Sequence, residues 1–376
     1  MGSGRWDYDA YEAAEVYRKA NGRSAFDYND RVLSRTPRNQ WRAHPSLEPY
    51  GVDVRESRDS AEHPASLAIS VLFDVTGSMG GVPRVLQTKL ADLHGLLLRK
   101  RYVDHPQIMF GAIGDAYSDR VPLQIGQFES DNRMDEQLGA IVLEGGGGGQ
   151  MRESYELAMY FMAHHTSLDC HEKRGKRGYL FIIGDEMAYP SVNPQHVSRI
   201  LGYRPDHGRP GDRPGERPGR GAFLATPVEE VVRELTRKFD VYYILPEGSS
   251  YVGNDEVLGS WRALLGQNVI QLDDLDAVCE TIALTIGLAE DRIDLDAGLE
   301  DLRDVGSAAG RSVERALGGL ESRRGRDRRD PRDRRAARRD HRPAGGAAGD
   351  TQDPAVRFLR AQGAGFTYDA GYDGRA

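Results

Sequence analysis

The sequence predicts an α/β fold in which a doubly wound, mostly parallel sheet is flanked by helices. Residues 67–73 form a near-continuous apolar run with β-branched side chains, which is typical of a strand buried on both faces of a parallel sheet. Further strand-like runs follow, and helical patterns separate most of them, as in repeated β-α units. The chain has 376 residues, 39% of them hydrophobic, which suffices for one sizeable core with polar appendages.

The expected elements of this domain follow one another along residues 63–290. Val82, Leu86 and Leu93 recur at helical spacing after the first strand and predict an amphipathic helix. The alternation of apolar runs with amphipathic stretches places the other elements. Strands are expected at residues 67–73, 107–113, 121–128, 179–183, 241–245 and 269–272, and helices at residues 82–100, 131–143, 152–164, 227–238, 257–266 and 277–287.

Four segments depart from this pattern. Residues 1–62 are polar, with one helical pattern at 8–19, and are interpreted as an N-terminal arm that leans on the main domain or awaits a partner. Residues 203–221 repeat Arg-Pro-Gly and are expected to form a solvated loop. Residues 291–304 are assigned to a helical or linker extension. Residues 305–376, first Arg/Asp-rich and then Gly/Ala-rich, are predicted to be a disordered tail that the fold does not need.

The composition excludes several classes of protein. The longest apolar runs are far shorter than the roughly 20 residues that span a bilayer, and the N-terminus lacks the apolar core of a secretory signal. Two lone cysteines, Cys170 and Cys279, cannot build a disulfide framework or a zinc knuckle. We therefore expect a cytoplasmic protein without a membrane partner, and the sequence leaves its oligomeric state open.

The formal charge is −8, but the basic residues are unevenly distributed. Residues 321–343 hold eleven arginines against five acidic residues. The interleaved acids roughly halve the net charge of this run, and it contains no aromatic side chains on which bases could stack. A nucleic-acid partner is therefore disfavoured.

Three oxygen-bearing side chains gather directly after the first strand. Asp74, Thr76 and Ser78 alternate on one tight loop, DVTGS, at the edge of a parallel sheet where ligands bind. Oxygen donors with little charge suit a hard cation such as Mg²⁺. A helix cap would explain one hydroxyl but not the aspartate. Asp115 and Asp119 follow the second strand and are expected at the same edge, as an acidic rim or as turn formers.

The DVTGS loop resembles the metal-ion-dependent adhesion site (MIDAS) of von Willebrand factor A (VWA) domains, here of an intracellular bacterial type. The resemblance covers residues 63–290 and implies a Rossmann-like fold whose metal site takes ligands from two further loops. The glycine run 145–149 has no threonine after it, so the resemblance transfers the second ligand position to Glu153, with Ser154 as the fallback. The motif FIIGDE supplies Asp185, with Glu186 as the substitute.

This resemblance implies a protein-binding module rather than an enzyme. The Mg²⁺ ion, with Mn²⁺ and Ca²⁺ as alternatives, would keep one coordination position open for a carboxylate of a protein partner. Intracellular members of the family often act as adaptors in multi-protein assemblies, commonly with AAA+ ATPases. The resemblance therefore implies a metal-dependent adaptor whose partner supplies an acidic residue.

An enzymatic alternative comes from the same loop. A strand that ends in Asp-x-Thr-Gly-Ser also resembles the nucleophile loop of haloacid-dehalogenase-type phosphoryl-transfer enzymes, in which the aspartate, here Asp74, becomes phosphorylated with the help of Mg²⁺. That chemistry also needs a lysine, for which Lys173 and Lys176 are the candidates. Glu153 has no role in such an enzyme, which favours the adaptor.

Overall fold

The computed structural model describes residues 4–79, 81–146, 151–202, 225–247, 249, 251 and 253–327, and of residues 78 and 321–327 it describes the backbone alone. The predicted loop at 203–221 lies outside the described residues. So do the greater part of the predicted tail and part of the glycine run.

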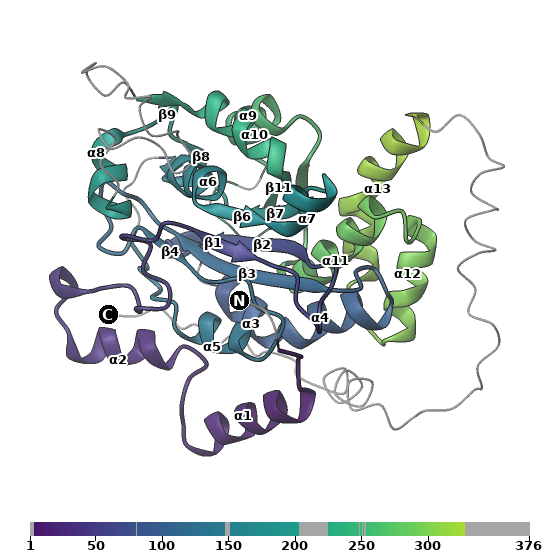
Figure 1. The fold of residues 1–376 in the computed structure, drawn as a ribbon, viewed down its shortest axis with the longest axis horizontal. Coiled ribbons are helices and arrows are strands. Elements are labelled where there is room, and N and C mark those ends of the chain that lie inside the picture. Colours follow the sequence, from purple (N-terminus) through teal and green to yellow (C-terminus); the bar gives the residue numbers. More distant parts are fainter. Residues whose placement is uncertain are drawn as a thin grey trace.

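A six-stranded sheet forms the centre of the molecule, with the strand order β12-β11-β7-β2-β3-β4 (Figure 1). All neighbouring strands are parallel except β3 and β4. Every residue of β2, β3 and β7 is buried. The predicted α/β class with a mostly parallel sheet is therefore confirmed. The strands are β2 (Leu67–Asp74), β3 (Pro106–Ile113), β4 (Leu123–Ile125), β7 (Gly178–Ile183), β11 (Phe239–Pro246) and β12 (Val269–Leu272).

Helices cover both faces of this sheet. In Figure 1, α6, α9 and α10 lie on one face, and α3, α4, α5 and α11 lie on the other. The bounds are α3 (Val82–Thr88), α4 (Leu90–Arg99), α5 (Arg133–Gly139), α6 (Tyr155–His164), α7 (Asp169–Arg174), α8 (Pro194–His196), α9 (Val228–Lys238), α10 (Asp255–Leu265) and α11 (Val278–Ala289). Short elements complete the body: η2 (Gly77–Met79), β5 (Arg152–Glu153), β8 (Met187–Ala188), β9 (Ser191–Val192), η3 (Val197–Leu201), β10 (Thr226–Pro227) and η5 (Leu275–Ala277).

Several predicted elements are shorter in the structure than expected. The helix at 82–100 divides at Lys89 into α3 and α4. The predicted strand at 121–128 is reduced to β4, and the helix expected at 131–143 ends at Gly139. The side chain of Gln124 explains the last difference, because it exchanges hydrogen bonds with the backbone N–H and C=O of Val142, at 2.9 and 2.8 Å. This pairing holds Val142 beside β4 in place of a further helical turn.

The order of strands places a topological switch point beside β2. The chain continues from β2 through β3 and β4 on one side and returns through β7, β11 and β12 on the other. Ligands of open α/β sheets bind at such a switch point, beyond the carboxyl ends of the strands. Asp74 ends β2, and Asp185 follows β7. The two predicted site aspartates therefore lie at this switch point.

The N-terminal arm packs on the main domain. It contains α1 (Tyr8–Ala20), α2 (Asp27–Arg35) and η1 (Arg38–Gln40), and Figure 1 shows α1 and α2 beyond α5. Tyr11 is buried and donates a hydrogen bond to the carbonyl of Gln87 at 3.0 Å, while Arg18 pairs with Asp135 at 2.6 Å. The described part of the arm is thus anchored by specific contacts, even though the spacing of its tyrosines forms no clean apolar stripe.

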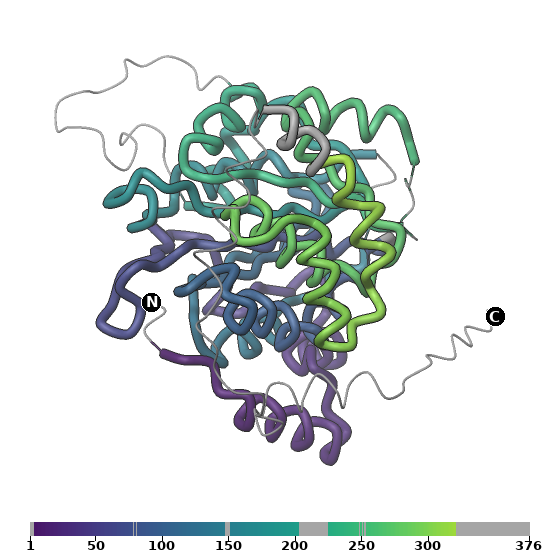
Figure 2. Tube along the Cα trace, turned by 90° about the vertical axis from the view of Figure 1, so that its right-hand side faces the viewer, coloured from purple at the N-terminus to yellow at the C-terminus, as the bar shows by residue number. Residues whose placement is uncertain are grey.

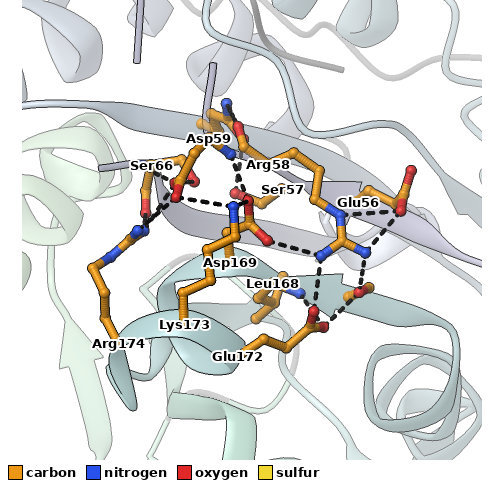
Figure 3. Close-up of polar contacts among 12 residues, drawn as sticks. Glu56, Ser57, Arg58, Asp59, Ser66, Leu168, Asp169, Glu172, Lys173 and Arg174 are labelled. Carbon is orange, nitrogen blue, oxygen red and sulfur yellow. Dashed lines mark hydrogen bonds and ion pairs between the residues drawn. The ribbon is translucent and has the colours of Figure 1, made fainter. Parts of the chain in front are cut away.

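The end of the arm is tied to the body by a short strand pair and an ion-pair cluster. Strand β1 (Arg55–Ser57) runs parallel to β6 (Thr166–Leu168). Figure 3 shows how Arg58 then contacts Asp169 and Glu172, at 2.9 and 2.8 Å, while Arg174 contacts Asp59 at 2.8 Å. Strands of three residues carry no periodicity, so the sequence could not indicate this pair.

The ion-pair cluster predicts acid sensitivity of this junction. Partial burial opposes ionisation, but hydrogen bonds from Arg174 and Ser66 hold the pKa of Asp59 well below its ordinary value. Because the pKa of Asp59 is lower in the folded protein, its ionised form stabilises the fold at pH values above its ordinary pKa of about 4. This contribution disappears as the pH falls through the folded-state pKa. Asp59→Asn should therefore unfold more easily than the wild type at pH 7. In urea unfolding, that difference should shrink below about pH 4, and a gap that stays constant with pH would contradict this account.

One helix extends the folded body beyond the predicted boundary at residue 304. Helix α12 (Leu295–Asp304) leads into α13 (Gly310–Asp327), which packs on β12 and α11 (Figure 2). Val313 and Leu317 are fully buried. The first part of the predicted tail is therefore a packed helix, because its few apolar residues recur four apart and reach the core.

Leu317 tests whether α13 belongs to the fold. Leu317→Ala should lower the free energy of unfolding by about 2–4 kcal/mol, because it leaves a cavity against the core. Glu314→Ala, on the exposed face of the same helix, should change it by less than about 0.5 kcal/mol. Equal stabilities for the two variants in chemical denaturation would show that α13 is dispensable.

No helix in the described ranges is both long and apolar enough to cross a membrane. Both cysteines, Cys170 and Cys279, are free and buried.

Candidate metal centre

Asp74 is the innermost residue of the candidate site. It ends the central strand β2 and is fully buried. Its Oδ1 accepts a hydrogen bond from the backbone N–H of Thr76 at 2.7 Å, and its Oδ2 accepts one from the hydroxyl of Tyr155 at 2.7 Å. Burial raises the pKa of Asp74 to about 6, although these hydrogen bonds favour the charged form. The carboxylate is therefore fixed in direction but poorly solvated.

The loop after β2 is held by the glycine run. The N–H of Gly77 donates to the carbonyl of Gly146 at 2.7 Å, and the N–H of Gly145 donates to the carbonyl of Val75 at 3.1 Å. Gly145 has a φ of +61°, which glycine adopts at little cost. Thr76 Oγ1 is buried, and the Thr76 hydroxyl lies close enough to Asp74 to favour the charged form of that carboxyl. The side chain of the third predicted ligand, Ser78, lies outside the described part.

Glu153 lies in β5, which pairs in parallel with β8, so that Glu153 is opposite Ala188. The sequence predicts a helix that begins at Arg152. Because residues 152 and 153 pair with β8 instead, α6 begins at Tyr155. Glu153 is 1% exposed, and its Oε2 finds no hydrogen-bond partner among the described residues. Burial raises the pKa of Glu153 to about 10, and the neighbouring Asp74 carboxylate adds to this shift.

The GDE loop after β7 brings two more carboxylates to the same place. Asp185 is fully buried and raises the pKa of Asp74 through its charge. Burial, followed by the charges of Asp74 and Asp185, raises the pKa of Glu186 to about 8. Glu186 Oε2 is also buried without a hydrogen-bond partner in the described chain. Asp74, Glu153, Asp185 and Glu186 therefore act on one another electrostatically.

An aromatic cluster fixes the backbone of the GDE loop. The carbonyl of Glu186 accepts hydrogen bonds from the indole N–H of Trp261 at 2.8 Å and from the hydroxyl of Tyr243 at 3.1 Å. The rings of Tyr243 and Trp261 stack at a centroid distance of 4.0 Å, and Tyr155 packs edge-on against both. Tyr155 thus connects this cluster to Asp74.

The side chain of Ser154, the fallback ligand, is hydrogen-bonded to the neighbouring loop. Its Oγ accepts a hydrogen bond from the N–H of Ala116 at 2.9 Å and lies 3.4 Å from Asp115 Oδ1. Asp119 Oδ2 accepts from the N–H of Asp115 at 2.8 Å. Asp115 and Asp119 are buried and shape the loop after β3, as turn formers do, while lying beside the site.

Arg38 of the N-terminal arm bridges the loops that surround the site. Its Nη2 lies 3.1 Å from Glu144 Oε2 and 3.5 Å from Asp119 Oδ1. Glu144 Oε1 in turn accepts from the backbone N–H groups of Arg120 and Val121, at 2.9 and 2.6 Å. The arm therefore fixes the approach to the glycine run, which no sequence pattern indicated because the contact joins segments far apart in the chain.

The donor set has the chemistry that a hard cation prefers, because carboxylate and hydroxyl oxygens are the usual ligands of Mg²⁺. Two buried carboxyl oxygens, Glu153 Oε2 and Glu186 Oε2, lack a hydrogen-bond partner in the described residues, and the acidic side chains around them raise their pKa values. Within the described ranges, however, no three His, Cys, Asp or Glu side chains are arranged to hold a metal ion, and this includes Asp74, Glu153 and Asp185.

The lysines required by the phosphoryl-transfer alternative lie elsewhere. Lys173 lies in the last turn of α7 and pairs with Asp169 at 2.6 Å, and Lys176 pairs with Glu290. Both lysines precede the first residue of β7, so they lie at the edge of the sheet opposite to Asp74. Neither can reach a substrate at Asp74 in this arrangement.

Comparison with known proteins assigns no family to this chain. No family model matches it, and no curated protein matches it in sequence. Among solved structures, it is similar to the pilus adhesin SpaC from Lactobacillus rhamnosus GG in its open conformation, with a TM-score of 0.39 and 8% identity. It is also similar to proximal thread matrix protein 1 from the mussel byssus, with a TM-score of 0.37 and 11% identity.

Both similarities are partial. They cover 64% and 60% of this chain but only 30% of the adhesin and 48% of the thread protein. Because both TM-scores are below 0.5, neither similarity assigns a fold family or a function.

Gly184 provides a structural test of the GDE loop. A Cβ at this position would lie 2.1 Å from the hydroxyl of Tyr155, so Gly184→Ala should displace that hydroxyl from Asp74. We expect a loss of about 1–3 kcal/mol in the free energy of unfolding. Gly259→Ala is the matched control, because this glycine lies inside α10 and an added Cβ would have open space around it, so the change should be neutral or stabilise by up to about 1 kcal/mol. Equal effects in thermal unfolding would contradict the assigned packing.

Proposed function

We propose that this chain is a VWA-type domain that binds a protein partner through a Mg²⁺ ion held by Asp74, Thr76, Ser78, Glu153 and Asp185. Mn²⁺ or Ca²⁺ would bind to the same oxygen ligands. The cation would supply an open coordination position that accepts a carboxylate of the partner. The protein is proposed to be cytoplasmic and to act as an adaptor in a multi-protein assembly, of which an AAA+ ATPase is the leading candidate member.

The observation that supports this proposal most strongly is the set of unpaired buried oxygens at the switch point. A buried polar atom without a hydrogen bond costs roughly 1–3 kcal/mol, and buried carboxylates that repel one another add to this cost. A divalent cation would compensate for the clustered acidic groups and provide a partner for Glu153 Oε2 at once. Glu186 would then either replace Asp185 as a ligand or, as an acidic neighbour, change the affinity of the site for the ion.

Binding, and not catalysis, is proposed because of what surrounds Asp74. Both oxygens of its carboxylate already accept hydrogen bonds, from Thr76 and Tyr155. The two candidate lysines are engaged in ion pairs at the opposite edge of the sheet. These contacts favour a fixed ligand over a nucleophile.

Asp74→Asn tests the metal site directly. The variant keeps the size of the side chain and a hydrogen-bond acceptor for Thr76 but removes the charge. Mg²⁺ should raise the melting temperature of the wild type and should not raise that of the variant, because only a ligand that binds the folded state stabilises it. Isothermal titration with Mg²⁺ and Mn²⁺ measures the affinities, and an unchanged affinity would refute the assignment.

Glu153 tests the second ligand position. Glu153→Gln should weaken Mg²⁺ binding at least tenfold, because it removes a charged oxygen from the ion. Glu156→Gln is the matched control: Glu156 is equally buried, but its Oε2 accepts a hydrogen bond from the N–H of Tyr189 at 3.3 Å. If the two variants bind Mg²⁺ with the same affinity, Glu153 is not a ligand.

The enzymatic alternative has its own test. Phosphoryl transfer at Asp74 would hydrolyse p-nitrophenyl phosphate in the presence of Mg²⁺, and Asp74→Asn would abolish this activity. We expect no hydrolysis by either protein. Turnover that depends on Asp74 would reverse the order of the two proposals.

A further inference from the structure

The surface beside the candidate metal centre differs chemically from the interior below it. The acidic residues of the two surrounding loops, Asp115, Asp119 and Glu144, are all buried. The exposed side chains of the same region include an aromatic and a basic one, and none of those in the loop after β3 is acidic: Tyr117 is 58% exposed, and Ser118 and Arg120 are exposed. In a chain with a net charge of −8, this places positive and aromatic groups outside and negative groups inside.

Tyr117 is held rigidly although it is exposed. Its ring packs against Tyr189 at a centroid distance of 4.7 Å and edge-on against His196 at 4.4 Å. Its backbone N–H donates to Asp115 Oδ1 at 3.1 Å. A fixed aromatic ring loses little conformational entropy on binding, and such rings dominate the energetics of many protein interfaces.

Two arginines from other segments frame this ring. Arg38, whose side chain is 53% exposed, reaches the same loop through Asp119. Arg199, in η3, is exposed and donates a hydrogen bond to the carbonyl of Ala116. Arg38, Tyr117, Arg120 and Arg199 therefore converge on the loop that follows β3, and we name these four residues the rim.

We infer that the rim is a docking surface for an acidic segment of a partner protein. The inference rests on the proposed function, because the partner's metal-binding carboxylate would lie next to the rim. Without a cation, the interior of the site offers only acidic groups to an acidic segment. A divalent ion would place a positive charge there, and the arginines present a complementary charge beside it. The rim therefore favours a partner segment in which several acidic residues surround the residue whose carboxylate binds the ion.

A random peptide library tests the inference without a known partner. Phage-displayed dodecapeptides are selected on the full-length protein in the presence of Mg²⁺ and eluted with EDTA. The selected peptides should be enriched in Asp and Glu. The peptide enriched most is then synthesised with a fluorescent label and titrated by fluorescence anisotropy.

Two pairs of variants separate the rim from general surface effects. Tyr117→Ala and Arg120→Glu should each weaken peptide binding at least tenfold. Tyr17→Ala, at a tyrosine of α1 that is 56% exposed, and Arg237→Glu, at an exposed residue in the last turn of α9 on the opposite edge of the sheet, should leave it unchanged. All four variants should bind Mg²⁺ like the wild type.

The outcomes distinguish the inference from the proposed function. If Mg²⁺ does not bind the wild type, the proposed function fails and the inference falls with it. If Mg²⁺ binds but selection yields no peptide, or yields peptides without acidic enrichment, the inference alone is overturned. Acidic peptides that depend on Mg²⁺ but bind the two rim variants normally would also overturn it.

Discussion

Four carboxylates lie buried where the central strands β2 and β7 end, and the surrounding structure compensates for their desolvation. Asp74 receives hydrogen bonds on both oxygens, whereas Glu153 Oε2 and Glu186 Oε2 receive none within the described residues. At roughly 1–3 kcal/mol for each unpaired buried oxygen, the two could cost several kcal/mol, which is a large share of the stability of a typical domain. A fold would retain so costly a cluster for a ligand, and a hard cation matches its chemistry.

The rest of the site keeps these carboxylates in place when nothing is bound. Repelling side chains would separate unless their backbones were fixed, and the structure fixes each one differently. The glycine run is hydrogen-bonded to the loop after β2, β5 is paired with β8, and the carbonyl of Glu186 is held by Trp261 and Tyr243. Because these contacts are hydrogen bonds and ring packing, they need no charge of their own. The positions of these acidic side chains are therefore set by the fold itself.

The fold could be predicted where burial produces periodicity. The run that forms β2 is buried throughout, so its apolar pattern identified the strand, and the strand end placed Asp74 at the ligand edge. The same reasoning placed Asp185. Contacts between distant segments leave no such pattern, so neither the hydrogen bond from Tyr155 to Asp74 nor the contacts of Arg38 with Asp119 and Glu144 could be predicted. Helix α13 was missed because Val313 and Leu317 are its main buried anchors in a mostly polar segment.

The position of Arg38 links the N-terminal arm to the metal centre. A guanidinium that contacts Asp119 and Glu144 offsets two acids that would otherwise add to the repulsion at the glycine run. The arm is itself anchored at both ends, by Tyr11 near its start and by Arg58 near its end. An arm held in this way keeps one positive charge at the approach to the site in the absence of any cation. Under the proposed function, a bound cation would add positive charge at this approach, so that the acidic groups would lie inside and the positive groups would face the partner.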